Sequence, residues 1–282
     1  MLMGTTLGAM ALAAAIQADT TFAVDPNLRL EVVNNSGEIF VRTWERNEIS
    51  IRTSYYRRSA LRIEHTSTAV RIGARSRYRD EDDDVEFLLT VPASMALELS
   101  GAETNVTVDG AGGEVSVDVS EGDVIVLGGA GRVSAQTDEG DIRVEGVTGR
   151  IRLFSMDGDI TVDGAAGDLE VETTDGIIEL VDIRAMTVQA NTVDGDIWFD
   201  GELFPGGSYT LSTHDGNVTA RIPEDADARV TVAVFDGDFS SDFPITVSSW
   251  PSGRRVEFTL GAGRAQLEIE SFDGEVVLRR RP

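Results

Sequence analysis

Short runs of alternating apolar and polar residues fill the second half of the chain, and each run stops at a glycine-containing turn. In one stretch Ile142 and Val144 follow a turn at Gly140, and Ile151 and Leu153 follow the next turn. Alternation with a period of two residues predicts β-strands with one buried face and one solvent face. No stretch of comparable length shows helical periodicity. The pattern therefore predicts an all-β fold.

The same stretch recurs at a regular interval. Gly122, Gly140, Gly158 and Gly176 are eighteen residues apart, and an acidic residue precedes each of them. Looser copies of the turn follow at residues 194–197, 214–218, 236–239 and 273–276. One unit cannot bury its own apolar face, so units of this kind must stack. The repeat predicts a single-stranded β-solenoid, or β-helix, of about 18–21-residue turn-strand units, either right-handed or flattened.

Four apolar positions recur in each unit, and we expect them to stack into a continuous buried ladder. The turn glycines are expected to adopt positive φ, so that a Gly140→Val change damages its own unit. The expected core positions in three units are Val124, Val126, Val133 and Ala135; Ile160, Val162, Leu169 and Val171; and Ile178, Leu180, Met186 and Val188.

The first hundred residues lack this regularity and predict longer strands. We divide the chain into a leader (1–18), an irregular N-terminal β cap (19–100) and a repetitive solenoid (101–282) that is continuous with the cap. A cap is expected because the end of a solenoid otherwise presents unpaired strand edges. The expected cap strands cover residues 28–33, 38–43, 48–55, 60–65, 69–74 and 85–91.

The leader carries no charge and is followed by a polar stretch that begins at Asp19. An apolar core before small residues is typical of a signal peptide, and we expect cleavage between Ala15 and Ala18. A short membrane anchor is the alternative, although a segment rich in Ala, Gly and Thr gains little from entering a bilayer. No later segment is apolar enough to span a membrane. The sequence therefore predicts an exported protein of the periplasm or cell surface.

Charge is distributed unevenly along the chain. The net charge is −25, and residues 1–80 hold eleven Arg and eight acids, whereas residues 81–282 hold thirteen Arg and forty-one acids. An acidic body repels nucleic acid and anionic lipid, so we expect no nucleic-acid partner. The chain has no cysteine. Disulfides and thiolate metal sites are therefore excluded.

The acidic residues beside the turn glycines suggest a metal site. They are expected to project from one edge of the solenoid at the spacing of its strands, where like charges about 5 Å apart repel by roughly 1 kcal/mol in water. A divalent cation would relieve that repulsion, and calcium prefers oxygen ligands of this kind. The opposing interpretation is that Asp beside Gly is favourable turn chemistry. The candidate calcium ligands are Asp123, Asp141, Asp159, Asp196 and Asp238.

The residues give little support to catalysis. A Ser-His-Asp or Cys-His arrangement needs a base, and the only histidines are His65 and His214. Paired carboxylates could serve a glycan-active β-helix enzyme, but acids that recur in every unit are explained by the repeat. We predict no catalytic residues and no cofactor other than the candidate calcium. One cleft with isolated carboxylates would favour the enzyme instead.

Three features resemble a known family. They are the Ser36-Gly37-Glu38-Ile39 segment, the Arg42-Thr43-Trp44 strand and the serial Asp-Gly-Asp-Ile turns. Over residues 28–280 they are similar to the adhesin-like family of bacterial cell-envelope β-solenoids, a domain family of unknown function. The resemblance implies an envelope protein with an adhesin-like role and transfers no catalytic residues.

These observations together predict a non-enzymatic exported cell-envelope protein. It would act by adhesin-like binding or as a structural scaffold, and its partner would be another envelope protein or a glycan. Two alternatives stay open: a glycan-active β-helix enzyme that uses acidic residues, and a self-associating envelope scaffold.

Overall fold

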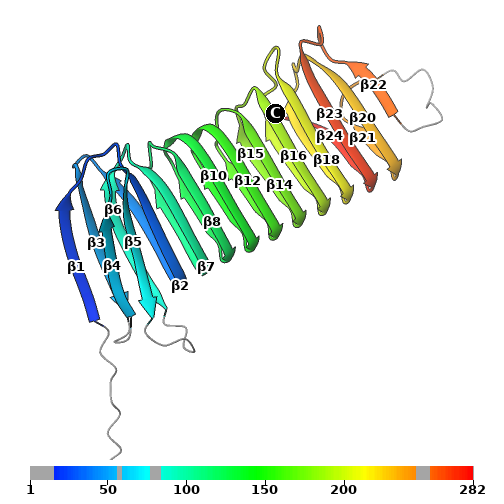
Figure 1. The fold of residues 1–282 in the computed structure, drawn as a ribbon. Coiled ribbons are helices and arrows are strands. Elements are labelled where there is room, and N and C mark those ends of the chain that lie inside the picture. Colours follow the sequence, from blue (N-terminus) through cyan, green and yellow to red (C-terminus); the bar gives the residue numbers. More distant parts are fainter. Residues whose placement is uncertain (1–15, 56–58, 77–83, 246–254, 282) are drawn as a thin grey trace, which may run out of the picture.

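The computed structural model describes residues 16–55, 59–76, 84–245 and 255–281. The predicted apolar core of the leader lies outside these residues. The described chain is all-β and forms a long, flat stack of strands that runs from β1 at one end to β20 and β22 at the other (Figure 1). Within these ranges no helix is long and apolar enough to cross a membrane. The predicted all-β solenoid is confirmed.

The N-terminal part differs from the repeats because two of its strands, with 16 and 14 residues, are longer than the longest repeat strands, which have 10. Residues 28–33 and 38–43 belong to one long strand rather than two, and a further strand precedes them in the expected cleavage zone. The N-terminal strands are β1 (Ile16–Ala23), β2 (Arg29–Trp44), β3 (Glu48–Tyr55), β4 (Ser59–His65), β5 (Ala69–Ser76), β6 (Val85–Pro92) and β7 (Ala96–Asp109).

Each repeat contributes one rung, which consists of a strand of the first row, a glycine turn and a shorter strand of the second row. Strands within a row are parallel, so β10 pairs with β8 and β12, and β11 pairs with β9 and β13. The first row contains β8 (Val115–Glu121), β10 (Ala130–Glu139), β12 (Thr148–Asp157), β14 (Leu169–Asp175), β16 (Thr187–Asp194) and β18 (Ser208–Asp215). The second row contains β9 (Val124–Leu127), β11 (Ile142–Glu145), β13 (Ile160–Asp163), β15 (Ile178–Ile183), β17 (Ile197–Gly201) and β19 (Val218–Pro223).

The core lies between the two rows. Val133 of β10 is in register with Ile151 of β12, and Ile142 of β11 with Ile160 of β13, so like positions stack directly on one another. All four of these side chains are buried. Burial of an aliphatic side chain contributes about 1.5–3 kcal/mol before the entropy cost of ordering the chain. The predicted ladder is therefore confirmed for these units.

One predicted core position is wrong. Met186 is 48% exposed, and Val188 and Ala190 fill the two buried apolar positions of β16. The register of β15 against β17 shifts between Leu180 and Ile183. Asp182, inside that shift, has a φ of 49°. This bulge takes up extra length in the unit between Gly176 and Gly195 and moves the core positions later than the regular spacing predicts.

The turn glycines have the positive φ that the repeat predicts. Gly140 has a φ of 142°, and a Cβ atom built on it would lie 2.4 Å from the carbonyl oxygen of Gly122 in the preceding rung. Both the backbone conformation and the close approach therefore require glycine. The short turns let successive rungs stack without a gap.

At the C-terminal end the spatial order of the rungs departs from the sequence order. β23 lies between β18 and β20, and β24 lies between β19 and β21, in parallel pairing on both sides. The last repeat of the chain is therefore inserted before the preceding one, and β22 closes the first row by antiparallel pairing with β20. These strands are β20 (Ala228–Asp236), β21 (Phe239–Ser241), β22 (Arg255–Thr259), β23 (Ala265–Asp273) and β24 (Val276–Arg281).

At the N-terminal end, too, the spatial order of the strands departs from the sequence order. β2 is inserted between β7 on one side and β5 and β6 on the other, although it precedes all three in the sequence. Beyond them β4 pairs antiparallel with β5, and β3 with β6 and β1. Antiparallel strands thus cover the N-terminal end in both rows and the C-terminal end in the first row.

Candidate functional site

The glycine turns line up along one long edge of the solenoid, which we call the turn edge. Each turn joins a first-row strand to its second-row strand, and the strand ends are in register, as Asp157 is with Asp175. The arrowheads of the first-row strands, such as β10, β12 and β14, follow this edge in Figure 1. Each turn contributes an outer residue two positions before the glycine, an acidic residue directly before the glycine, and a residue directly after it.

A ladder of buried hydroxyl groups supports the turn edge from inside. The Thr137 hydroxyl donates to the carbonyl oxygen of Gly122 at 3.2 Å, and that of Ser155 to Gly140 at 3.0 Å. The equivalent bond to a glycine carbonyl oxygen of the neighbouring rung is made by Thr173, Thr192, Thr213 and Ser271. The sequence prediction missed this ladder, although the signal was present as a Ser or Thr three residues before the glycine.

The residues that follow the glycines form a second hydrogen-bond ladder. The backbone N–H of Asp141 donates to Oδ1 of Asp123 at 3.0 Å, and that of Asp159 donates to Oδ1 of Asp141 at 2.9 Å. Asp159 and Asp196 accept in the same way from Ile177 and Asn217. These side chains therefore satisfy backbone donors of the next rung.

The ladder bears on the predicted calcium ligands without testing calcium itself. Asp123, Asp141 and Asp159 lie in consecutive rungs, whereas Asp196 is separated from them by the Ile177 rung, and Asp238 lies in the β20–β21 rung beyond the inserted one. Among the described residues no group of three or more His, Asp or Glu side chains is arranged to hold a metal ion. Calcium binding stays a prediction.

Towards the C-terminal end the outer residues of the turn edge become apolar and aromatic. Val193 is 52% exposed, Phe272 49% and Phe235 54%. The His214 ring stacks on Phe272, with centroids 4.7 Å apart and planes at 19°, and Phe272 stacks on Phe235 at 5.3 Å and 27°. We call Val193, His214, Phe272 and Phe235 the aromatic row. The inserted β23 assembles it, because it places Phe272 between the other two rings.

The acids of the turn edge differ electrostatically from those on the strand faces. On the first row Arg152 pairs with Glu170 at 2.7 Å, and Arg255 pairs with Glu268 at 3.1 Å. Within the described ranges no arginine forms an ion pair with the acids that flank the aromatic row at Asp194, Asp196, Asp215, Asp273 and Glu275. These five carboxylates around the aromatic row therefore have no cationic partner in the described chain.

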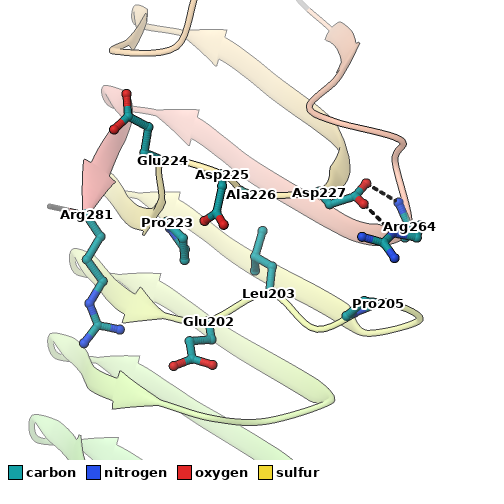
Figure 2. Close-up of a pocket in the computed structure, with 10 residues that line it drawn as sticks. All are labelled: Glu202, Leu203, Pro205, Pro223, Glu224, Asp225, Ala226, Asp227, Arg264 and Arg281. Carbon is teal, nitrogen blue, oxygen red and sulfur yellow. Dashed lines mark hydrogen bonds and ion pairs between the residues drawn. The ribbon is translucent and has the colours of Figure 1, made fainter.

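A cleft of about 830 Å³ lies on the opposite edge, near the C-terminal end (Figure 2). It forms where the connections from a second-row strand to the next first-row strand become longer. In a regular rung residues 146–147 join β11 to β12, whereas residues 202–207 join β17 to β18. Four acids, two arginines and four apolar or proline residues line it, namely Glu202, Leu203, Pro205, Pro223, Glu224, Asp225, Ala226, Asp227, Arg264 and Arg281.

Two of the cleft residues hold the surrounding chain in place. Asp227 accepts backbone hydrogen bonds from Ala262 at 2.8 Å and Arg264 at 3.0 Å, and it ion-pairs with the Arg264 side chain. The Arg264 backbone N–H and side chain lower the pKa of Asp227, so its carboxylate stays ionised. Across the cleft, Arg281 pairs with Asp182 at 2.9 Å and with the buried Asp200 at 3.1 Å.

The two histidines make aromatic contacts rather than a catalytic arrangement. His65 packs edge-on against Phe22, with ring centroids 4.8 Å apart, and His214 belongs to the aromatic row. Neither side chain forms a hydrogen bond with a serine or an acid in the described part of the chain. The contacts described for the two rings are therefore aromatic packing contacts.

The fold and its surfaces define the class of the protein as a parallel β-solenoid whose strand rows enclose an aliphatic core and whose turn edge is acidic. Residues 17–279 match the Toastrack DUF4097 family, and the chain belongs to that family. The adhesin-like resemblance seen in the sequence is thereby confirmed. No curated protein matches the chain.

Several solved structures are similar to this chain. A "putative adhesin" from Parabacteroides distasonis has 9% identity and a TM-score of 0.48, covering 95% of this chain and 98% of its own. One from Bacteroides fragilis has 12% identity and a TM-score of 0.42, covering 95% and 99%. A "putative cell adhesion protein" from Clostridium sporogenes has 7% identity and a TM-score of 0.28, covering 95% and 100%. The adhesion names are those of the solved structures, and the likeness concerns the fold alone.

Proposed function

We propose that the protein is a non-enzymatic, exported protein of the bacterial cell envelope that binds another envelope component through the surface of its solenoid. Binding of this kind needs a rigid, extended surface rather than a reactive group. The stacked rungs supply such a surface because each one is fixed by backbone pairing to both neighbours.

The aromatic row is the observation that carries this proposal. Phe272 and Phe235 are about half exposed, although a repeat of this length could place a small polar residue there, as it does at Ser120 and Thr174. Exposed apolar residues that gather in one place, with polar residues around them, mark interaction sites in soluble proteins. Aromatic side chains are also enriched at the centres of protein interfaces.

Binding to envelope material tests the proposal. Beads coated with the chain from Asp19 onward are incubated with washed envelope fragments, and the bound material is quantified against beads coated with heat-unfolded chain. We expect saturable binding to the folded chain alone. Equal binding to both bead types would overturn the proposal. Fractionation of the producing cells tests export: we expect the chain in the periplasmic or surface-exposed fraction, with a new N-terminus between residues 16 and 19.

The cleft favours a second candidate, the glycan-active enzyme, because carboxylates line it where longer connections interrupt the regular repeat. Glu202 and Asp225 make the best pair to test, since the structure uses Asp227 to hold Arg264. Release of reducing sugars from envelope polysaccharides, lost in Glu202→Gln or Asp225→Asn, would establish the enzyme. Our proposal predicts no release by the unmodified chain, with unchanged binding to envelope fragments in both variants.

A further inference from the structure

The aromatic row and its flanking acids combine exposed apolar rings with closely spaced like charges. Its rings are exposed and stacked, and carboxylates lie beside them in every rung of the row, as Asp215 does beside His214 and Asp273 beside Phe272. Like charges repeated at rung spacing repel one another. An exposed apolar patch also costs solubility unless it has a partner. A partner with cationic and apolar groups together would satisfy both.

We propose that the aromatic row binds an extended, basic segment of a partner protein that carries apolar side chains. This inference rests on the proposed function and names the chemistry of its partner. The four rungs of the row span about 14 Å at the usual strand spacing, which four or five residues of extended chain cover at about 3.3 Å each. Arg or Lys side chains of the segment would pair with the flanking carboxylates, and its apolar side chains would pack on Phe272 and Phe235.

The charges favour a basic polypeptide over the other macromolecules of an envelope. An anionic lipid surface and a nucleic acid would each bring negative charge against Asp194, Asp215 and Asp273. A second copy of this chain that docked by the same edge would bring an identical set of carboxylates.

The ring geometry disfavours a sugar. A sugar ring stacks on the open face of an aromatic ring, and Phe272 has His214 on one face and Phe235 on the other. At its centre, at Phe272, the row therefore offers a ring edge rather than an open face, and Val193 adds an aliphatic side chain. Ring edges and aliphatic groups suit the packing of apolar amino-acid side chains.

Fluorescence anisotropy with short synthetic peptides tests this inference. The probes are a peptide of alternating Arg and Leu, one of alternating Arg and Ser, and one of alternating Glu and Leu. The protein variants are Phe235→Ser/Phe272→Ser, which removes the rings, and Asp215→Asn/Asp273→Asn, which removes charge at two rungs. Leu88→Ser is the matched control, because Leu88 is 42% exposed on β6 near the other end of the solenoid. Thermal melting checks that each variant is folded.

We expect the Arg-Leu peptide to bind most tightly and to lose about tenfold in affinity with the ring variant, and less than about twofold with the control. The charge variant should bind more weakly at low salt and show a smaller dependence on salt concentration. Equal binding of the Arg-Ser and Arg-Leu peptides would overturn the inference, as would equal losses in the ring variant and the control.

Two further measurements test whether the aromatic row binds a lipid membrane or a second copy of the chain instead. Vesicles of anionic lipid that bind the unmodified chain and not the ring variant would replace the polypeptide by a membrane surface. A dimer in sedimentation that the ring variant abolishes would replace it by a second copy. Either result overturns the inference. If envelope fragments bind the folded chain equally with and without the rings, the proposed function stands and this inference fails.

Discussion

The hydroxyl of Ser271 donates a hydrogen bond to the carbonyl oxygen of Gly216 at 2.9 Å, across 55 residues of sequence. The bond repeats the contact that Thr213 makes with Gly195 in the adjacent rung. The inserted rung thus uses the same internal ladder as the regular repeats. The Ser or Thr in these turns therefore helps the rungs to stack and is not only a strand residue.

The hydroxyl ladder predicts that Thr173→Val destabilises the protein. The substitution keeps the shape of the buried side chain and removes its donor to Gly158, which lies 3.1 Å away. We expect a loss of about 1–2 kcal/mol in the free energy of unfolding. The next residue, Thr174, is exposed, so Thr174→Val should change the stability by less than about 0.5 kcal/mol. Chemical denaturation measures both, and equal effects would contradict the ladder.

The close approach of rungs predicts different costs for two glycine substitutions. In Gly140→Ala the added Cβ meets a carbonyl oxygen at 2.4 Å, whereas in Gly146→Ala nothing lies within 4 Å of it. Both glycines have positive φ, and the conformational cost of Ala is about 1 kcal/mol at Gly146, where φ is 61°, and larger at Gly140, where φ is 142°. Only Gly140→Ala adds a clash between rungs. Its melting temperature should be clearly lower than that of Gly146→Ala, and similar values would show that rung spacing does not require the glycine.

The aspartate ladder predicts that an amide can replace a carboxylate at Asp141. Asn217 already accepts from the backbone of Glu275 at 2.9 Å, in the way that Asp141 accepts from Asp159. Asp141→Asn should therefore stay close to the unmodified stability, whereas Asp141→Ala should lose about 1 kcal/mol.

Thermal unfolding with calcium, magnesium or chelator at fixed ionic strength tests the calcium prediction separately. If the carboxylates act only as hydrogen-bond acceptors, calcium and magnesium will shift the melting temperature equally. A rise specific to calcium that Asp141→Asn removes would instead establish the metal edge predicted from the sequence.

The C-terminal ion pairs predict a dependence of stability on pH. The hydrogen bond from Arg281 lowers the pKa of Asp182 below its ordinary value of 3.8. A carboxyl with a lower pKa in the folded state stabilises the fold above its unfolded pKa, and this contribution is lost as the pH falls through the folded pKa. Arg281→Met should therefore melt below the unmodified chain at pH 7, and the difference should shrink below about pH 3.8. A difference that does not change with pH would exclude the ion pair as its cause.

Local pattern was sufficient to predict the regular part of the fold. Alternation identified the strands, and the glycine spacing identified the repeat, because both signals come from residues in contact with their own neighbours in the rung. The bulge at Asp182 lengthens its unit, so the fixed spacing wrongly predicted that Met186 is buried. The insertion of β23 beside β18 could not be predicted, since the pairing of strand edges depends on which edge is free and not on local sequence.

The candidate site was predictable only in part. The acids of the turns were found, because Asp beside Gly recurs in the sequence, but their bonds to the next rung depend on a register that the sequence does not display. Phe235 and Phe272 stood out in no pattern, since each is a single aromatic residue in its own turn. Only the order of the rungs brings the two rings into contact and places Phe272 between His214 and Phe235.

Binding of envelope fragments by the ring variant tests the central claim most directly. Beads coated with unmodified chain, with Phe235→Ser/Phe272→Ser or with Leu88→Ser are compared at equal surface density. The account predicts that the ring variant loses about tenfold in apparent affinity while the Leu88 variant binds like the unmodified chain. Equal binding by all three would contradict the claim that this edge of the solenoid meets the partner.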